Sequence, residues 1–316
     1  MEFALYRYEF EVKERKDSSA NLFPDPWDNL SPRQAFEKKS ELLDELLEKD
    51  HQQLLAAPIG TKAALPFAYK KKPLHHKYTA APKNGFAILE LARLASVRHR
   101  PLPFQTDTVK EDDYKSLHII IDNRGTHQRV AIEEKASVYS PDTVAQSLVD
   151  ALCKAFARYG LLVKVVPVRD DKHFWKTVND RKQYPRGFKR LCAVFPQIND
   201  KELSERMRRA QMEYREMFNS NLTIKQEAPQ GESLRFDEAD EKQREYVNIC
   251  TENADTLMLS PIGGRSFRLG GKTAKTQQMS ERERKSLEED HRQQEIFDDD
   301  PTQSTKSFMD KAYGKA

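Results

Sequence analysis

Cysteine is scarce in this sequence of 316 residues, and its placement is uninformative for chemistry. Cys153, Cys192 and Cys250 lie far apart, are odd in number and form no CxxC pair. This usage is typical of reduced thiols in a cytoplasmic protein and argues against a disulfide framework or a cysteine zinc site. The eight histidines show neither HxxxH nor HExxH spacing, so we expect no histidine metal site.

Long apolar runs are also missing. No segment approaches the roughly 20 apolar residues of a membrane-spanning helix, and the beginning, MEFALYRYEFEVKERK, is too charged for a signal peptide. We therefore expect a cytoplasmic protein without direct membrane insertion. The GxSxG motif of serine hydrolases is absent as well.

An excess of one charge is the third absence. Lys and Arg number 53 against 50 Asp and Glu, a formal net charge of +3, so total charge indicates no class of partner. The distribution of charge along the chain must supply that information instead.

Periodicity and turn residues predict an α+β protein with a mostly antiparallel sheet, hairpins and flanking helices. Ser31-Pro32 and Ser140-Pro141 each combine a capping serine with proline at the first helical position, and Gly160 follows the second helix as its stop signal. The segment 84–97 is either a strand or a short helix. The remaining expectations are an N-terminal strand, strands near 161–168, 186–195, 222–228 and 255–261, and a helix at 200–218.

The predicted organisation has three parts. Residues 1–110 form an N-terminal α+β region, and residues 111–272 form a second α+β region with a central hairpin. From residue 273 onward few apolar residues remain, and we expect residues 273–316 to be a disordered charged tail whose removal leaves the melting temperature nearly unchanged.

The helix at about 32–56 carries a leucine-rich stripe formed by Phe36, Leu43, Leu46, Leu47 and Leu54. Such a stripe is typical of core packing. A dimer seam is the alternative interpretation, and it makes the chain a candidate homodimer.

HIIIDNRGTHQRVAIEEKAS, residues 118–137, resembles the D…ExK signature of the PD-(D/E)xK nuclease superfamily, in which two acids hold a divalent ion and a lysine steadies the attacking water. With a two-residue loop at Arg124-Gly125, Asp122 pairs with His127, and Glu133 then lies about 20 Å from Asp122 along the hairpin. Asp122 therefore fails as a ligand. The nuclease hypothesis is left with Asp113, Glu133 and Lys135, with Mg²⁺ as its only cofactor; a plain hairpin is the alternative.

PIGGRSFRLGGKTAK matches only the end of a phosphate-binding loop, because Ser266 stands where the first glycine is required. We interpret the stretch as a basic loop around Arg265 or as a hairpin with glycine turns.

Two basic runs with interleaved aromatic residues are the positive signal. The first, at 61–100, includes Lys70, Lys71, Lys72 and Lys77, and Glu90 is its only acid. The second, at 169–190, includes Lys172, Lys176, Arg186, Lys189 and Arg190. Such runs can neutralise phosphates while their aromatic rings stack on bases or wedge a groove. A solvated face with core aromatics is the alternative.

The order of four segments resembles Rex A-type DNA-binding sensors of bacterial anti-phage systems. These segments are FALYRYEF, NGFAILEL, HIIIDNRGTHQRVAIEE and KRLCAVF, and the resemblance covers residues 1 to about 225. It implies a cytoplasmic, dimeric protein that binds double-stranded DNA and works with a membrane or effector protein. No diagnostic motif is shared, so no residue role is carried over.

The sequence thus favours a non-enzymatic protein that binds nucleic acid, with double-stranded DNA first, and that needs no cofactor. A Mg²⁺-dependent nuclease and a scaffold whose basic face meets an acidic protein are the alternatives.

Overall fold

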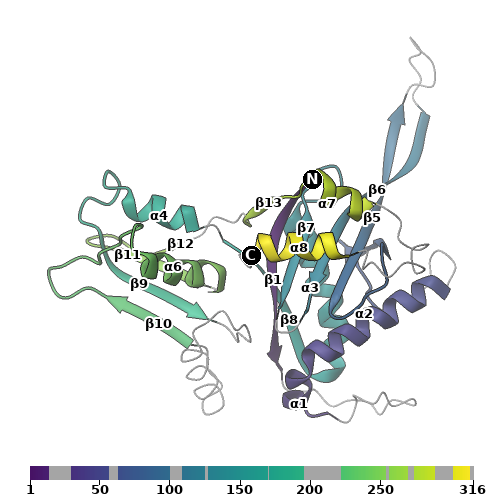
Figure 1. Ribbon diagram of the computed structural model, residues 1–316, viewed down its shortest axis with the longest axis horizontal. Coiled ribbons are helices and arrows are strands. Elements are labelled where there is room, and N and C mark those ends of the chain that lie inside the picture. The colour runs from purple at the N-terminus through teal and green to yellow at the C-terminus, as the bar shows by residue number, and fades with distance from the viewer. Residues whose placement is uncertain are drawn as a thin grey trace. The chain divides into compact units, whose positions relative to one another are not determined.

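The computed structural model describes residues 1–13, 30–56, 63–99, 109–124, 127–169, 171–195, 222–253, 256–269, 274–288 and 302–313. Helices and antiparallel sheets form the structure, which confirms the α+β class (Figure 1). The chain divides into unit 1, Met1–Val165 with Thr276–Ala316, and unit 2, Val166–Lys275. The division does not fall at residue 110, because that residue lies inside a strand paired throughout its length. None of the described helices is long and apolar enough to span a membrane.

Unit 1 is built on one large sheet. Its strand order is β13 (Thr276–Gln278), β1 (Glu2–Val12), β7 (Arg129–Glu133), β6 (Val109–Asp122), β5 (Phe86–His99) and β4 (His75–Tyr78), and β8 (Leu161–Pro167) also pairs with β1. The ambiguous segment 84–97 is thus a strand. Its β-branched and apolar residues pair in register with β6 from Phe86↔Asp122 to His99↔Val109.

The hairpin β6–β7 has a longer loop than the sequence predicted. Asp122 pairs with Arg129, so the two-residue loop and the pairing of Asp122 with His127 are wrong. The reason is chemical: the side chains of Arg124 and His127 both contact the Asp122 carboxylate, which holds them in the loop and not in the ladder.

One face of this sheet, the apolar face, consists of alternate residues such as Tyr8, Phe10, Ile119, Ile121 and Leu89, all buried. It is covered by α1 (Pro32–Glu37), α2 (Lys39–Ala56) and α3 (Pro141–Phe156). The predicted caps are confirmed: Ser31 and Gln34 form a capping box, and the Ser140 side chain accepts a hydrogen bond from the N–H of Thr143. A short 3₁₀ turn, Ala157–Tyr159, precedes Gly160 at φ 69°, the predicted stop.

The leucine stripe of α2 belongs to this core. Leu43 and Leu47 are each 1% exposed, and Phe36, Leu46 and Leu54 are half-buried. Leu43 and Leu47 therefore pack in the core of unit 1, as the core-packing interpretation expected.

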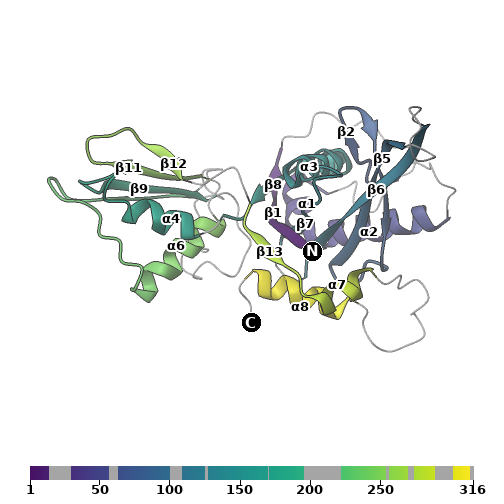
Figure 2. The ribbon, with the colours of Figure 1, turned by 90° about the horizontal axis from the view of Figure 1, so that it is seen from above.

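The opposite face, the mixed face, carries Phe3, Arg7, Asp122, Arg129 and Glu133 among its residues. It is covered by the C-terminal segment, with α8 on the other side of the sheet from α3 (Figure 2). That segment comprises β13, α7 (Glu281–Glu288) and α8 (Gln303–Ala312).

Disorder was therefore the wrong prediction for residues 276–278, 281–288 and 303–312. Average composition concealed local order, because the few apolar residues of the segment are concentrated on one side of α8. Phe308, Met309 and Ala312 are at most 3% exposed, and Phe308 stacks 5.4 Å from Phe3 between ring centroids. Residues 289–301 and 314–316 lie outside the described part of the chain.

Unit 2 is a second α+β body. Its sheet has the order β10 (Leu222–Glu227), β9 (Phe188–Phe195), β11 (Thr256–Pro261) and β12 (Phe267–Leu269), all antiparallel. With α4 (Asp171–Asn179) and α6 (Glu241–Asn253) it forms one core that includes Phe174, Trp175, Leu191, Leu257 and Leu259. The hairpin reading of PIGGRSFRLGGKTAK is confirmed for β11–β12. The predicted helix at 200–218 lies outside the described residues.

Candidate nucleic-acid interface

Three lysines of the first basic run, Lys70, Lys71 and Lys72, occupy the tip of a tight hairpin. β2 (Ala68–Tyr69) pairs with β3 (Lys72–Pro73), and Lys70 and Lys71 form the two-residue turn between them. Both turn residues have positive φ, 47° and 64°. Positive φ at both positions is the requirement of a type I′ turn, which Asn-Gly normally satisfies. Lysine at these positions costs about 1–2 kcal/mol each. The turn therefore carries two positive charges at a cost to the stability of the fold.

These lysines adjoin a pair of tyrosines. The Lys70 ammonium lies 5.3 Å from the Tyr69 ring centroid, and the Tyr69 and Tyr139 rings lie 4.8 Å apart. The Arg93 guanidinium covers Tyr139 at 4.7 Å and donates a hydrogen bond to the Ser137 carbonyl at 3.1 Å. Both tyrosines are partly exposed.

We call Lys70, Lys71, Lys72, Tyr69, Tyr139 and Arg93 the basic tyrosine surface. It brings together the β2–β3 turn, β5 and the segment before α3. Sequence reasoning found its lysines but missed Tyr139, because nothing in a single sequence relates residue 139 to residue 69.

The other aromatic residues of the first run do not serve a binding surface. Phe67, Tyr78 and Phe86 are at most 5% exposed, so their expected role in stacking on bases is wrong. The Tyr78 hydroxyl donates to the buried Asp50 carboxylate at 2.8 Å, and burial raises the pKa of Tyr78 well above its usual value. Lys77 is exposed but lies 2.7 Å from Glu90, a surface ion pair on neighbouring strands.

The second basic run belongs to unit 2. Its aromatics Phe174 and Trp175 are at most 3% exposed, and Tyr184 packs against the same core, so these rings are also structural. The charged side chains lie outside: Lys172 and Lys176 on α4, Arg186 before β9, and Arg265 in the β11–β12 turn are exposed.

Lys189 and Arg190 share the carboxylate of Glu227 across the β9–β10 ladder, at 4.0 and 2.7 Å. Lys225 lies 2.6 Å from the same carboxylate. Hydrogen bonds from Lys225 and Arg190 lower the pKa of Glu227 to about 2. Part of the expected phosphate-binding charge is therefore neutralised within unit 2.

The residues of the nuclease hypothesis do not converge. Glu133 is buried, and its Oε2 lies 2.9 Å from the backbone N of His118 and 2.8 Å from His118 Nδ1. Asp113 stands five residues further along β6, about 17 Å away at roughly 3.3 Å per residue. An odd separation also puts it on the other face of the strand. Burial raises the pKa of Glu133, but the His118 hydrogen bonds outweigh it, and the net shift is downward.

Lys135 is exposed and forms a backbone bridge with Tyr139. Glu133 is thus held in a buried hydrogen-bonded pair with His118, Asp113 occupies an exposed strand position, and Lys135 lies in a turn. Two ligands of one Mg²⁺ must each reach it at about 2 Å, a condition that Asp113 and Glu133 do not meet.

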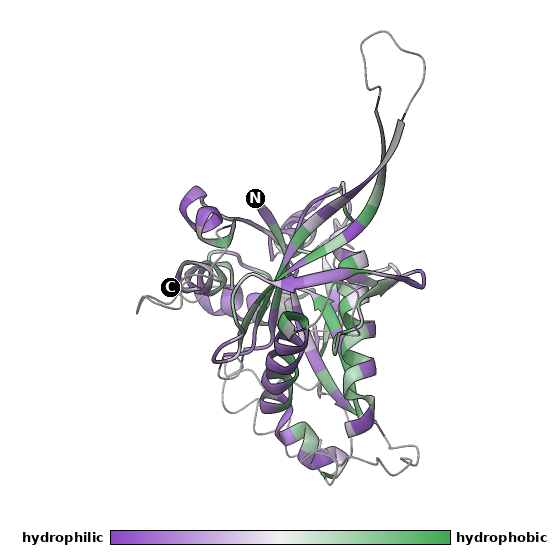
Figure 3. Cartoon of the chain, turned by 90° about the vertical axis from the view of Figure 1, so that its right-hand side faces the viewer, coloured by the Kyte–Doolittle hydropathy of each residue, from purple (hydrophilic) through white to green (hydrophobic). Residues whose placement is uncertain are grey.

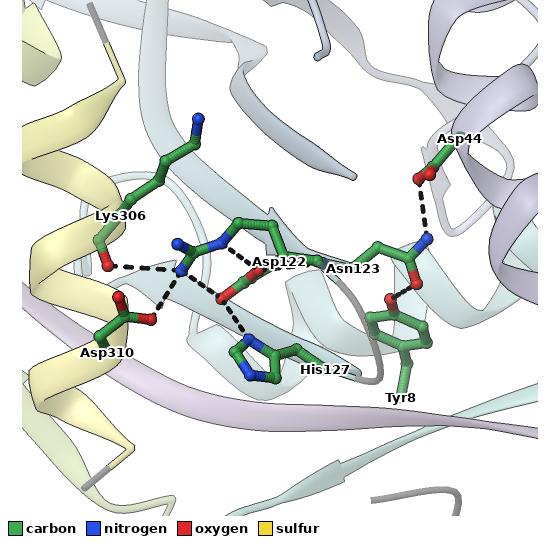
Figure 4. A network of polar contacts seen from close by, with 8 residues as sticks. Tyr8, Asp44, Asp122, Asn123, His127, Lys306 and Asp310 are labelled. Carbon is green, nitrogen blue, oxygen red and sulfur yellow. Dashed lines mark hydrogen bonds and ion pairs between the residues drawn. The ribbon is translucent and has the colours of Figure 1, made fainter. Parts of the chain in front are cut away.

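Asp122 instead anchors a polar network between the hairpin loop and α8 (Figure 4). Arg124 binds its carboxylate through Nε and Nη2, both at 2.9 Å, and Nη2 also lies 2.7 Å from Asp310. His127 Nδ1 lies 3.4 Å from Asp122. Although burial raises it, hydrogen bonds from His127 and Arg124 lower the pKa of Asp122 to about 2.

The side-chain donors of Asp122, His127 and Asp310 lie within 4.8 Å of one another, the spacing of a metal site. The Arg124 guanidinium bridges both carboxylates, however, and supplies the positive charge that a cation would bring. This donor set therefore fits an ion pair better than a metal.

On the other side of the loop, Asn123 joins the hairpin to the apolar face (Figure 4). It accepts from the Tyr8 hydroxyl at 2.6 Å and donates to Asp44 at 2.7 Å. The Asp122–Asn123 pair thus connects the hairpin end with a helix on each side of the sheet.

Comparison with known proteins adds no family. No protein-family model matches the chain, and no curated protein matches it in sequence.

Proposed function

We propose that this chain binds nucleic acid, double-stranded DNA first, through the basic tyrosine surface of unit 1. The observation that carries the proposal is the turn at Lys70-Lys71, where two exposed lysines occupy left-handed conformations beside the Tyr69–Tyr139 pair. A hairpin tip is narrow, and three lysines on it can approach adjacent phosphates. An anti-phage role rests on the resemblance in layout alone.

The tyrosine pair and Arg93 support the same proposal. Partly exposed rings flanked by cations are typical of surfaces that stack on bases or contact sugars, with about 1–3 kcal/mol per stacked base. The exposed residues of unit 2, Lys172, Lys176, Arg186 and Arg265, are further candidate phosphate contacts. Lys189 and Arg190 are weaker candidates because Glu227 already binds them.

The test is fluorescence anisotropy with labelled duplex DNA, single-stranded DNA and RNA across a salt series, with and without Mg²⁺. Lys70, Lys71 and Lys72 changed together to Gln should weaken binding to every duplex sequence by a similar factor. The slope of log K against log salt should flatten by roughly one unit per lost contact. The matched control changes three exposed lysines elsewhere in unit 1, Lys49, Lys154 and Lys285, to Gln. If both triple variants had equal effects, or if wild type did not bind at low salt, the basic tyrosine surface would be ruled out as the nucleic-acid-binding site.

A single change separates charge from strain. Lys71→Gly restores the residue that a type I′ turn favours, so the free energy of unfolding should rise by about 1 kcal/mol while duplex affinity falls. Greater stability with unchanged affinity would show that the turn lysine is not a contact.

Tyr69→Leu tests stacking in the same assay. It keeps an apolar side chain but removes the π face, so affinity for single strands should fall more than affinity for duplex. Cleavage products with Mg²⁺ would instead revive the nuclease alternative.

A further inference from the structure

The outer part of the β5–β6 hairpin has no neighbouring strand. β4 pairs with β5 only over Leu89–Ala92, and β7 pairs with β6 only over Ile119–Asp122. Within the described residues, Arg93–His99 and Val109–Lys115 therefore pair only with each other. We call these two segments the outer ribbon; Figures 1 and 3 show it extending away from the other strands of unit 1. A two-stranded ribbon is marginally stable in water, so a further strand would stabilise it.

The two free edges of the outer ribbon differ in charge. The β6 edge carries Glu111, Asp112 and Asp113 in succession, and charged residues protect an edge from pairing. The β5 edge carries the uncharged run Leu94-Ala95-Ser96-Val97.

The base of the ribbon is also apolar on its surface. Leu94 and Tyr114 face each other across the ladder, and they are 53% and 57% exposed, among the most exposed large apolar side chains of the described residues. The acidic run lies on β6 alone, so the β5 edge is the one without a run of charged residues that would oppose pairing with a further strand.

We propose that the β5 edge pairs with the β5 edge of a second copy of this chain, antiparallel about a two-fold axis perpendicular to the sheet. Such an axis keeps the same face of both sheets on one side. Because directly opposite residues of an antiparallel pair point to the same face, one residue must lie opposite its own copy at the centre of the register. Centring on Ser96 uses the whole free edge, Arg93–His99. It sets Leu94 opposite the partner's Arg98 and Ala95 opposite the partner's Val97.

Charge distinguishes this arrangement from the alternative edge. In the β5 register Arg93 meets the partner's His99, and no two arginines are opposed. The same operation on β6, centred on Asp112 directly opposite Ser96, would set Glu111 against the partner's Asp113. Like charges directly opposite destabilise a strand pair. The β5 arrangement is isologous and closes as a dimer without leaving an open chain of copies. It does not depend on nucleic acid.

Cross-linking tests the register. Directly opposite residues in an antiparallel pair have Cα atoms about 4.5–5.5 Å apart, within the range of a disulfide. Ser96→Cys should therefore form an intermolecular disulfide on mild oxidation, identified by mass spectrometry as a peptide joined to its own copy through the substituted position. Asp112→Cys is the matched control, because Asp112 lies directly opposite Ser96 in the ladder and belongs to the edge that the acidic residues protect. Equal cross-linking of both variants would overturn the proposal.

Light scattering without nucleic acid tests the charge argument. Wild type should have twice the chain mass of 36.7 kDa. Leu94→Lys opposes the partner's Arg98 and should raise the dimer dissociation constant at least tenfold. Leu94→Glu, which loses the same apolar side chain, should remain dimeric because it meets that arginine with the opposite charge. A monomeric wild type, or equal dissociation of the Lys and Glu variants, would contradict the β5 pairing. Because nucleic acid is absent, this outcome is separate from that of the proposed function.

Discussion

The two faces of the large sheet in unit 1 bury different kinds of side chain. The apolar face presents mainly aliphatic and aromatic side chains to α1–α3, and its polar groups include tyrosine hydroxyls that donate to Asp142, Asn123 and the buried Asp50. The mixed face buries full charges: Arg7 is 7% exposed, Glu9 2% and Arg129 2%.

The covers of the two faces match this difference. α3 meets the sheet with apolar residues such as Leu148, Leu152 and Phe156. α8 combines Phe308 with polar contacts, since Asp310 binds Arg124 and the Tyr313 ring lies 4.7 Å under the Arg129 guanidinium. The Tyr313 hydroxyl also donates to the carbonyls of Tyr6 and Val130.

Burial on both faces explains why the sequence of β1 does not reveal which of its side chains face solvent. Residues 3–10 are all buried, so alternation between polar and apolar residues no longer separates solvent from core. Arg7 and Glu9 are charged yet inside. A buried charge is tolerated only where partners and hydrogen bonds stabilise it, so the mixed face depends on its own cover more specifically than the apolar face does.

Removal of α8 is the strongest way to break this comparison. Truncation after Glu288 deletes Phe308, Met309 and Tyr313 and exposes Phe3, Phe86 and the charges beneath. Loss of the two large apolar side chains alone costs on the order of 5 kcal/mol or more, comparable to the whole stability of many domains. Chemical denaturation should show loss of the cooperative transition of unit 1. Truncation after Tyr313 is the control and should change nothing; equal stability of both truncations would make α8 peripheral.

Substitution of one phenylalanine in each cover tests whether α8 and α3 contribute equally to the stability of the sheet. Phe308 meets Phe3 on the mixed face at 5.4 Å, and Phe156 meets Phe10 on the apolar face at 5.1 Å. Both side chains are 1% exposed. Each change to Ala should lower the free energy of unfolding by about 3–5 kcal/mol. A cost below about 1 kcal/mol for Phe308→Ala alone would show that α8 detaches before the sheet unfolds.

Local signals allowed much of this fold to be predicted. Ser31, Gln34 and Ser140 fix helix starts through contacts within three residues, and Gly160 ends a helix by its own backbone conformation. Most of the longer strands were predicted for the same reason, since alternation and turn residues act over short distances. The segment 84–97 stayed ambiguous, and β2, β3, β4 and β13 were not predicted. The lysines of the basic tyrosine surface were also visible as a run.

Contacts between distant segments could not be predicted. The hairpin register depends on Arg124, which Asp310 holds from the other end of the chain. Order at residues 303–312 depends on a site for Phe308 that only the folded sheet provides. Tyr139 joins Tyr69 through folding alone. The last two failures arise from interactions that span scores of residues, whereas the hairpin combines the local contacts of Arg124 and His127 with Asp122 and the long-range contact with Asp310.

Acid should weaken the Asp122 anchor of the mixed face. The folded-state pKa of Asp122 is about 2, below its ordinary value of 3.8. A lowered carboxyl pKa contributes stability above the unfolded value, about 2 kcal/mol here, and this is lost as pH falls from about 4 to 2. Asp122→Asn should therefore be less stable than wild type at pH 6 by about this amount, and the difference should shrink toward pH 2. A pH-independent difference would attribute the loss to packing and not to ionisation.

The smallest effects come from Glu133 at the end of β7 and from Lys135 two residues beyond it, and they separate a structural role from a catalytic one. Glu133 is buried against His118, so Glu133→Gln should lower the free energy of unfolding by about 1–2 kcal/mol through the weakened charge-assisted hydrogen bonds. Lys135 is exposed, so Lys135→Gln should stay within about 0.5 kcal/mol of wild type. Denaturation measures both, and a nuclease assay with Mg²⁺ and Mn²⁺ on the same preparations supplies the second readout. If wild type cleaves DNA and both variants lose cleavage while Lys135→Gln keeps full stability, the two residues act on a metal and its water. In that case the mixed face would contain a catalytic centre and not merely a hydrogen-bonded Glu133–His118 pair.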